Sequence, residues 1–285
     1  MALVGKPNVG KSTLINRLVG TKVAITSSKP QTTRHRVLGV MHGEDYQIVL
    51  VDTPGLMQPR HALGRKMEKW ALEESREADL VLFLVELTHP PTAEDQFAAG
   101  HLASLGKRVW LVLNKLDRRK DDQVADLYRQ LGSYARSFEV SGLEGTGLDE
   151  LTRALREFLP EGDPFFPPDQ VTDQNRALLA SEVIREKVLH LTRQEIPHAV
   201  AVVVEEIRPA DKPDMLYVSA YLYVERPNQK RILIGKHGQL LKAIGAEARA
   251  ELEELWGQRI FLELWVKVKE GWRDREDWLR SLGYE

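Results

Sequence analysis

The feature that most constrains the fold is a glycine-rich segment near the start of the chain, GKPNVGKS (residues 5–12), which follows the apolar triplet ALV (residues 2–4). It fits the pattern GxxxxGK[ST]. The glycines of this pattern let backbone N–H groups wrap around phosphates, and the helix that follows points its positive end at the same anion. In such a loop Lys11 reaches the β- and γ-phosphates, and Ser12 ligates Mg²⁺. The segment therefore predicts a phosphate-binding loop between a strand and a helix.

Short apolar runs alternate with helical stretches over the first 160 residues. The runs are typical of strands covered on both faces, as in a parallel sheet: Gln47–Asp52, Asp79–Val85 and Arg108–Leu113. Helices are expected between them, with Gly20 and Gly132 as C-caps: Lys11–Val19, Leu63–Glu77, Glu94–Ser104, Asp121–Leu131 and Leu148–Leu159. The alternation predicts an α/β domain over residues 1–160, with a doubly wound, mostly parallel sheet that binds ligands at the carboxyl ends of its strands.

A second loop, DTPG (residues 52–55), closes one of the predicted strands. Asp52 at the carboxyl end of a strand can hold Mg²⁺ through water, and the N–H of Gly55 can contact a γ-phosphate. A Pro-Gly pair on its own favours a plain β-turn. Its position after a phosphate loop instead indicates the second half of a metal and phosphate site.

A third loop, NKLD (residues 114–117), follows the strand at Arg108–Leu113. A carboxylate can accept two hydrogen bonds from the N1–H and the exocyclic amine of guanine, and adenine does not offer that pair of donors. Asp117 is suited to this role, Asn114 to tying the loop together, and the stem of Lys115 to covering the base. The loop therefore indicates a preference for guanine over adenine nucleotides.

The composition changes after residue 160, where PEGDPFFPPDQVTD (residues 160–173) contains four prolines. Such a segment forms neither helix nor strand readily, and we expect a stiff linker at residues 161–173. The remainder, residues 174–285, predicts a smaller α+β domain. Its expected elements are a helix at Gln174–Glu195, strands at Ala199–Ile207 and Leu216–Val224, a glycine-interrupted helical segment at Lys230–Leu255, and a strand at Ile260–Val268.

The glycine-interrupted segment contains GKHG (residues 235–238) in a locally basic stretch. Residues 161–285 carry 22 acidic and 18 basic side chains, yet residues 226–246 hold five basic side chains and no acidic one. Two glycines let the backbone approach a nucleic-acid backbone closely, and the start of the next helix favours phosphate. The stretch therefore predicts a site for a phosphate backbone, with these candidate residues: Arg226, Lys230, Arg231, Ile234, Gly235, Lys236, His237, Gly238 and Lys242. The apolar residues nearby are expected to build the wall of this groove and the core beneath it: Ile232, Ile234, Leu240, Leu241 and Ile244.

Composition excludes several other classes of function. The chain has no cysteine, so a disulfide scaffold, a thiolate metal site and a cysteine nucleophile are excluded. The eight histidines form no zinc-binding pattern, and no apolar run approaches the ~20 residues that cross a bilayer. The first motif begins at Gly5, which argues against a signal peptide. A net charge of −2 does not suit a uniformly basic nucleic-acid coat. We expect a soluble intracellular protein.

The three loops, GKPNVGKS, DTPG and NKLD, closely resemble those of the translation-factor-related GTPases. Within that resemblance, SGL (residues 141–143) matches a final loop whose backbone N–H groups contact the guanine oxygen, and QTTRHR (residues 31–36) is similar to the first switch of the Era group. The match implies Thr33, rather than Thr32, as a ligand of Mg²⁺ and the γ-phosphate. It also makes Asn8 a candidate ligand for K⁺.

The resemblance implies GTP and GDP as ligands, with Mg²⁺ held by Ser12, Thr33 and Asp52. The implied nucleotide-binding residues are Gly5, Lys6, Pro7, Asn8, Val9, Gly10, Lys11, Ser12, Thr13, Asp52, Thr53, Pro54, Gly55, Asn114, Lys115, Asp117, Ser141, Gly142 and Leu143. The candidate catalytic residues are Lys11, Thr33 and Gly55. Leu56 stands where Ras-like proteins place a water-orienting glutamine, so slow intrinsic hydrolysis is expected.

The second domain resembles a type II KH domain, both in its GxxG loop and in its expected order of helix, strand, strand, helix, helix and strand. Such loops clamp about four single-stranded nucleotides. The Era resemblance covers nearly the whole chain and implies binding to the 3′ end of 16S ribosomal RNA under control of the bound nucleotide. It further implies a role in biogenesis of the small (30S) ribosomal subunit, and weak peripheral association with the cytoplasmic face of the inner membrane.

Other interpretations remain open at this stage. The chain could be a membrane- or cell-cycle-linked signalling GTPase whose second domain docks a protein. It could also be a constitutive RNA-binding assembly factor whose nucleotide domain acts only as a brace. An ATPase is the weaker alternative, because NKLD selects guanine. No dimerisation motif is visible in the sequence, and we expect a monomeric cytoplasmic protein.

Overall fold

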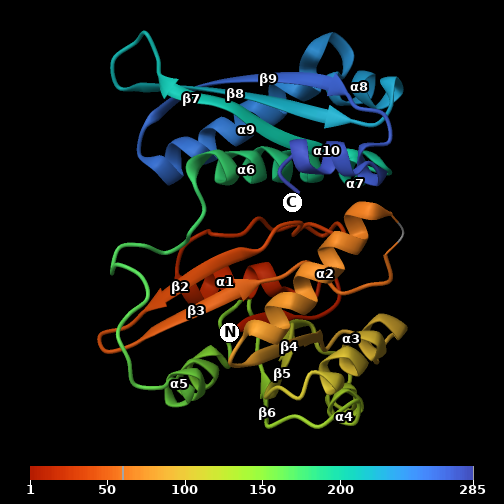
Figure 1. Ribbon diagram of the computed structural model, residues 1–285, viewed down its shortest axis with the longest axis vertical. Coiled ribbons are helices and arrows are strands. Elements are labelled where there is room, and N and C mark those ends of the chain that lie inside the picture. Colours follow the sequence, from red (N-terminus) through yellow and green to blue (C-terminus); the bar gives the residue numbers. More distant parts are fainter. Residues whose placement is uncertain (60, 285) are drawn as a thin grey trace. The chain divides into compact units, whose positions relative to one another are not determined.

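The computed structural model describes residues 1–59 and 61–284, and it divides into two compact units (Figure 1). The first unit extends to Asp173 and the second begins at Gln174, with the short segment His61–Leu63 grouped with the second. Each unit has its own sheet and its own core. The two units are therefore described separately.

The first unit is built on a six-stranded sheet in the order β2-β3-β1-β4-β5-β6. Its strands are β1 (Ala2–Val4), β2 (Val37–His42), β3 (Gln47–Asp52), β4 (Val81–Glu86), β5 (Val109–Asn114) and β6 (Arg136–Glu139). All neighbouring pairs are parallel except β2 and β3. The predicted fold class, a mostly parallel doubly wound sheet, is confirmed.

Helices pack against both faces of this sheet. They are α1 (Lys11–Val19), α2 (Ala62–Glu77), α3 (Ala93–Ser104), α4 (Gln123–Arg129) and α5 (Leu148–Phe158), with the short 3₁₀ helix η1 at Leu116–Arg118. In β4, Leu82 and Leu84 join the core formed with α1 and α5, while Phe83 and Val85 join the core formed with α2, α3 and α4. Burial on both faces is the reason that β4 is a continuous apolar run.

Of the two predicted C-cap glycines of the first unit, one is confirmed and the other is wrong, and two strands were not predicted. Gly20 closes α1 in the left-handed conformation with a φ of 82°, as a C-cap glycine should. The C-cap prediction for Gly132 is wrong, because α4 ends at Arg129 and Gln130 caps it in a right-handed conformation. Strands β2 and β6 were not expected from the sequence. β6 is short, and only Phe138 of its four residues is buried, so it lacks the apolar run that marks a central strand.

The proline-rich segment at residues 160–173 lies along β2 and β3. The N–H of Val40 donates to the carbonyl oxygen of Val171 at 2.8 Å, and the imidazole Nε2 of His42 lies 2.9 Å from the carbonyl oxygen of Gln170. The side chain of Gln47 accepts hydrogen bonds from the N–H groups of Phe165 and Phe166. The segment is thus held against the first unit through its backbone.

The second unit contains a three-stranded sheet in the order β7-β8-β9. Its elements are α6 (Arg176–Leu191), α7 (Ile196–Ala199), β7 (Ala201–Pro209), β8 (Met215–Val224), α8 (Pro227–Ile234), η2 (Lys236–Gly238), α9 (Gln239–Trp256), β9 (Arg259–Val268), η3 (Trp272–Asp274) and α10 (Glu276–Ser281). β7 and β8 are antiparallel, and β8 and β9 are parallel. The predicted order of elements is confirmed, with α7 and α10 in addition.

One face of β8 supplies the centre of the second core. Alternate residues of the strand are buried against α6 and α9: Leu216, Val218, Ala220, Leu222 and Val224. The sequence predicts this alternation because successive side chains of a strand point to opposite faces. Within the described residues, no helix is long and apolar enough to cross a membrane.

Replacing Leu222 by alanine tests the second core. Leu222 has no exposed surface, and truncation of such a side chain costs about 3 kcal/mol because a cavity remains. We expect Leu222→Ala to lower the free energy of unfolding by that amount in urea denaturation. Ile232→Ala serves as the control, since Ile232 is 48% exposed and its truncation should change stability by less than ~0.5 kcal/mol. Equal effects of the two changes would contradict the assignment of this core.

Candidate functional site

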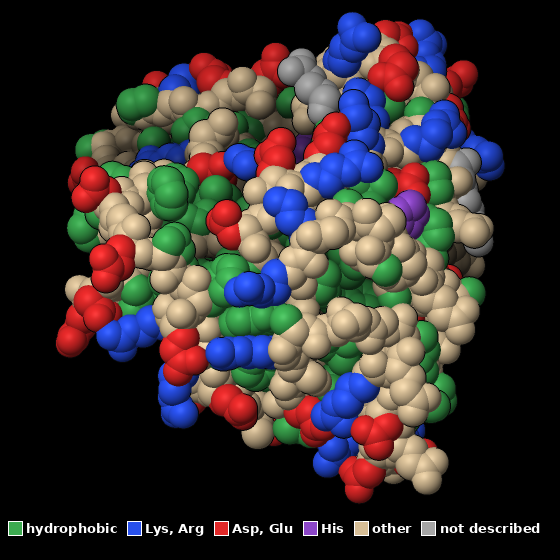
Figure 2. All heavy atoms as spheres, turned by 60° about the horizontal axis from the view of Figure 1, so that its bottom comes forward, with side chains coloured by type: hydrophobic (Ala, Val, Ile, Leu, Met, Phe, Trp, Pro, Cys, Tyr) green, Lys and Arg blue, Asp and Glu red, His purple; other side chains and the backbone are tan. Residues whose placement is uncertain are grey.

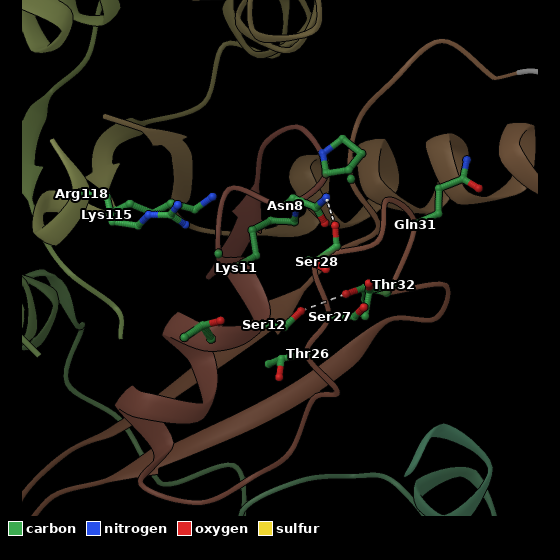
Figure 3. A pocket seen from close by; sticks show the side chains of 15 residues that line it. Asn8, Lys11, Ser12, Thr26, Ser27, Ser28, Gln31, Thr32, Lys115 and Arg118 are labelled. Atoms are coloured by element: carbon green, nitrogen blue, oxygen red, sulfur yellow. Dashed lines mark hydrogen bonds between the residues drawn. The ribbon is translucent and has the colours of Figure 1, made fainter. Parts of the chain in front are cut away.

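A pocket of about 420 Å³ lies at the carboxyl ends of the parallel strands in the first unit (Figure 3). The glycine-rich loop forms one part of its lining, residues 26–33 form another, and Gly55 with the base loop completes it. The lining residues are Pro7, Asn8, Gly10, Lys11, Ser12, Thr13, Thr26, Ser27, Ser28, Gln31, Thr32, Thr33, Gly55, Lys115 and Arg118.

The glycine-rich loop connects β1 to α1 and depends on its glycines. Gly10 has a φ of 98°, and a Cβ atom there would lie 2.3 Å from Nδ2 of Asn114. Lys11 is buried, and its ammonium donates to the carbonyl oxygens of Gly5 (3.1 Å) and Lys6 (3.0 Å). Burial lowers the pKa of Lys11 to about 8, although the charge of Asp52 opposes the shift. The loop thus surrounds a cation whose water shell has been removed.

Three side-chain oxygens meet beside this cation. Ser12 Oγ lies 2.6 Å from Asp52 Oδ2 and 3.0 Å from Thr33 Oγ1, and Thr33 Oγ1 lies 3.2 Å from Asp52 Oδ2. The dashed line at Ser12 in Figure 3 marks its contact with the hydroxyl of Thr33. Thr32 is directed elsewhere, because its hydroxyl donates to the carbonyl oxygen of Lys29 at 2.7 Å. The geometry groups Thr33, and not Thr32, with Ser12 and Asp52.

These oxygens suit a small divalent cation. Hard oxygen donors from one carboxylate and two hydroxyls are the ligands that Mg²⁺ takes in phosphate sites. Burial raises the pKa of Asp52, while Lys11, Ser12 and Thr33 oppose that shift. The second carboxylate oxygen, Oδ1, is buried and has no hydrogen-bond partner among the described residues. A metal-bound water is a chemically suitable partner for that oxygen.

The base loop is joined to the glycine-rich loop through one amide side chain. Asn114 Nδ2 donates to the carbonyl oxygen of Val9 at 2.8 Å, and Asn114 Oδ1 accepts from the N–H of Gly142 at 2.9 Å. The hydroxyl of Ser141 donates to Asp117 Oδ1 at 2.5 Å. The loops at residues 5–12, 114–117 and 141–143 therefore form one hydrogen-bonded assembly.

The predicted nucleotide-binding residues differ in their relation to the pocket. Gly5 and Val9 belong to the glycine-rich loop but do not line the pocket. Asp52, Thr53 and Asn114 are buried and do not line it either. The ammonium of Lys6 contacts Asp95 at 2.8 Å rather than lining the pocket. Leu143 is 68% exposed and does not line it either.

Sequence reasoning missed four lining residues, Thr26, Ser27, Ser28 and Arg118, and it named Gln31 only as part of the expected first switch. Thr26, Ser27 and Ser28 form a hydroxyl-rich run just before the expected switch, and this run could have indicated that they line the site. Asn8 Nδ2 donates to the carbonyl oxygen of Ser28 at 2.8 Å, so the run is held to the glycine-rich loop (Figure 3). Arg118 is an exposed residue of η1, and its type alone gave no signal.

The GxxG segment of the second unit forms a tight connection between α8 and α9. Gly235 has a φ of 75°, His237 one of 52° and Gly238 one of 76°. A Cβ atom at Gly235 would lie 2.8 Å from Cβ of Leu240, whereas nothing lies within 4 Å of one placed at Gly238. Lys236 and His237 are exposed at the tip. The segment presents its backbone and two donors to solvent.

The surroundings of this segment correct one expectation. Leu233 and Ile244 are buried beneath the loop, and Ile234 and Leu240 are partly buried against the same core. Ile232 is not part of the core, because this residue of α8 is 48% exposed. Arg226, Arg231 and Lys242 are exposed, and Lys230 is partly buried.

Figure 2 shows acidic and basic side chains interspersed with apolar ones over the face that it draws. This distribution agrees with the net charge of −2 for the whole chain. Residues 226–246 differ from this average, because they hold five basic residues and no acidic one.

Comparisons with known proteins divide the chain in a similar way. Residues 1–115 match the family described as 50S ribosome-binding GTPase, and residues 195–273 match the KH domain. GTPase Era of Carboxydothermus hydrogenoformans is 48% identical, with 100% of this chain and 96% of that protein covered. GTPase Era of Alkaliphilus metalliredigens is 43% identical, with 100% and 98% covered.

Two solved structures are similar over almost the entire chain. A variant of Aquifex aeolicus Era bound to GDP and AlF₄⁻ is 43% identical with a TM-score of 0.95, and 99% of this chain and 97% of that chain are covered. Era in complex with MgGDPNP and nucleotides 1506–1542 of 16S ribosomal RNA gives a TM-score of 0.96 at 43% identity, with the same coverage. With the phosphate, metal and base loops on one unit and the GxxG loop on the other, the chain belongs to the Era family of GTPases.

Proposed function

We propose that this protein is a guanine-nucleotide switch that hydrolyses GTP slowly, binds the 3′ end of 16S ribosomal RNA through its KH domain, and acts in biogenesis of the 30S subunit. The observation that carries the proposal is the pocket in which Lys11, the Ser12–Thr33–Asp52 oxygens and the base loop meet. The similar Era structures bound to MgGDPNP with 16S RNA, and to GDP with AlF₄⁻, support it.

The phosphate end of the nucleotide is assigned to the glycine-rich loop. The ammonium of Lys11 lies among backbone carbonyls and would pair with the β- and γ-phosphates. Ser12 and Thr33 would hold Mg²⁺ directly, and Asp52 would hold it through water. The bound ion supplies positive charge against the phosphate oxygens. Gly55, whose Cβ position is closed by Pro7, would contact the γ-phosphate through its N–H.

The base end is assigned to the loops that Asn114 joins. The carboxylate of Asp117 would accept from guanine N1–H and the exocyclic amine, and the backbone of residues 141–143 would contact the guanine oxygen. The stem of Lys115 would cover one face of the base. Adenine lacks the two donors that face a carboxylate in this arrangement, so the site should discriminate against ATP.

Slow hydrolysis follows from the side chain after Gly55. Leu56 has no exposed surface and belongs to the core with α2 and α3. It carries no polar group and cannot orient an attacking water. Catalysis would then depend on stabilising the negative charge of the transition state, with Lys11, Thr33 and Gly55 as the contributing residues. Asn8 lines the same pocket, and we assign its carboxamide oxygen as the ligand for a K⁺ ion that would add positive charge.

Nucleotide control of RNA binding has a local basis in the first switch. The Thr33 hydroxyl meets Ser12 and Asp52, so a metal and γ-phosphate bound at these oxygens would order residues 26–33. Loss of the γ-phosphate would release them. Such a change can shift RNA affinity only if the two states of the protein bind RNA unequally.

The RNA site is assigned to the loop between α8 and α9. Its two glycines allow a close approach of the RNA backbone, and the exposed Lys236 and His237 can pair with phosphates. The exposed Arg226, Arg231 and Lys242 extend the positive charge on either side. No observation favours a docked protein at this loop.

Location follows from the family resemblance. We place the protein in the cytoplasm, with weak peripheral association at the cytoplasmic face of the inner membrane, and we expect a monomer. Co-sedimentation with vesicles of anionic and zwitterionic lipid would test the membrane part of this assignment, since peripheral association of this kind should require anionic headgroups.

The function is tested by titrating a fluorescent RNA that matches the 3′ end of 16S ribosomal RNA into the full chain. We expect tight, sequence-selective binding with a non-hydrolysable GTP analogue and weaker binding with GDP. A scrambled RNA of equal length is the control for non-specific charge attraction. Equal RNA affinity in both nucleotide states would contradict nucleotide control and would support only RNA binding. Equal affinity for the scrambled RNA would contradict the assigned partner.

Replacing Thr33 by valine removes one oxygen from the Ser12–Thr33–Asp52 group at constant shape. We expect Mg²⁺-dependent affinity for the GTP analogue to fall by about tenfold, because one ligand of the metal is lost. Thr32→Val is the matched control, since the Thr32 hydroxyl bonds to Lys29 and should leave affinity near that of the wild type. A larger effect at Thr32 than at Thr33 would reverse the assignment. Isothermal titration at several Mg²⁺ concentrations measures both.

Replacing Asp117 by asparagine should change the base preference. The amide oxygen of asparagine can still accept from N1–H, but its NH₂ group then faces the exocyclic amine of guanine, donor against donor, whereas xanthine offers an acceptor oxygen at that position. We expect GDP affinity to fall by about 100-fold or more and xanthosine diphosphate to become the preferred ligand. Asp122→Asn, at a side chain that is 88% exposed at the N-cap of α4, is the control. Unchanged selectivity in competition binding would show that Asp117 does not contact the base.

Replacing Gly238 by aspartate tests the RNA loop without a clash. Gly238 has open space around its Cβ position, and a carboxylate there would repel the RNA backbone. We expect about a tenfold or greater loss of RNA affinity, with GDP affinity unchanged. Gly257→Asp is the matched control, because Gly257 also has a positive φ, of 62°, and open space, but caps the far end of α9. Equal RNA affinity in both variants would place the RNA elsewhere.

A further inference from the structure

Glu86 is the last residue of β4, and three basic side chains converge on its carboxylate. The ammonium of Lys115 pairs with Oε2, while His89 Nε2 lies 3.1 Å and Lys6 Nζ lies 3.8 Å from Oε1. The Glu86 side chain is only 12% exposed. None of the sequence motifs contains Glu86 or His89, yet both contact residues that belong to motifs.

The first contact concerns the base loop. Lys115 has a left-handed backbone with a φ of 61°, and it directly follows Asn114, which lies opposite Glu86 in the pairing of β4 with β5. The ion pair with Glu86 therefore sets the direction in which the Lys115 side chain extends. Because the stem of Lys115 is assigned to cover the guanine, the position of Glu86 determines one wall of the base site.

The second contact concerns the phosphate loop. The ammonium of Lys6 lies 2.8 Å from Oδ2 of Asp95, a fully buried residue at the start of α3. The same oxygen accepts from the N–H of Thr92 at 2.8 Å and from the hydroxyl of Tyr128 at 3.2 Å. Lys6 is thus turned away from the pocket and anchored to the block formed by the end of β4 and the start of α3.

The charge on Glu86 is maintained by its partners. Burial by itself raises the pKa of Glu86, but the hydrogen bonds and charges of Lys115, His89 and Lys6 outweigh it, and the pKa lies below its ordinary value. The carboxylate is therefore ionised at neutral pH. Removing its charge would leave the Lys115 ammonium without the carboxylate that it contacts, and one partner of a partly buried pair is costly to remove.

We propose that Glu86 is a positioning residue for guanine-nucleotide binding, which orients Lys115 of the base loop from the end of β4, where Asp95 anchors Lys6 of the phosphate loop. The proposal rests on the function proposed above. Glu86 does not touch the reacting phosphates and acts on the base through Lys115. Its loss therefore weakens GDP and the GTP analogue alike and leaves the hydrolysis of bound GTP unchanged.

The test is a double-mutant cycle with Glu86→Gln, Lys115→Met and the combined variant, titrated with fluorescent N-methylanthraniloyl-GDP. We expect Glu86→Gln to bind about tenfold more weakly than the wild type. Because Glu86 acts through Lys115, the combined variant should bind no more weakly than Lys115→Met alone. Single-turnover hydrolysis at saturating GTP should proceed at the wild-type rate in Glu86→Gln. Glu73→Gln, which breaks an exposed pair with Lys69 (3.5 Å), is the matched control and should bind normally.

Three results would overturn the proposal: wild-type affinity in Glu86→Gln, additive losses in the combined variant, or slowed single-turnover hydrolysis.

Thermal unfolding without nucleotide checks that each variant folds. Glu86→Asp keeps the charge on a shorter side chain and should bind between the wild type and Glu86→Gln. If Glu86→Gln does not fold, wild-type affinity in Glu86→Asp would contradict the proposal. A wild-type protein that binds no guanine nucleotide would refute the proposed function itself, which is a different outcome from any difference among the variants.

Discussion

The site depends on one geometric constraint, which is that parallel strands end at the same edge of their sheet. In the register of the first unit Leu3 lies opposite Asp52, and Glu86 lies opposite Asn114. The glycine-rich loop, the metal loop and the base loop therefore leave the sheet side by side. Strand β4 is buried on both faces, because helices cover either side of the sheet. The polar chemistry lies where the apolar strands stop.

Asn114 shows how the loops become one site. Both polar atoms of its amide are bonded, one to the glycine-rich loop at Val9 and the other to Gly142. Gly10 must lack a side chain partly because this amide occupies the space beside it. A preorganised arrangement of this kind spares the nucleotide the entropy cost of ordering three loops. The residue that gives the base loop its signature is thus also the one that holds the phosphate loop.

Long apolar strands and glycine-marked loops were predictable, while weak elements were not. β4 and β8 follow directly from their hydrophobic patterns, and the order of elements in the second unit matches the expectation. β6 has one buried residue, so its strand comes from pairing with β5 rather than from its own sequence. Gly132 and Ile232 show the same limit, since a C-cap and a core position depend on where the helix ends and which face it buries.

By itself, the sequence determined the loop chemistry, because residue type and spacing limit what a phosphate, a metal or a guanine can contact. It also determined the two-domain α/β and α+β plan through its hydrophobic periods. Only the tertiary structure decided that the Thr32 hydroxyl turns to Lys29, and which way the ammonium of Lys6 points. It alone brought Glu86 to Lys115. These are contacts between segments far apart in the chain, and local residue patterns carry no information on the distances between such segments.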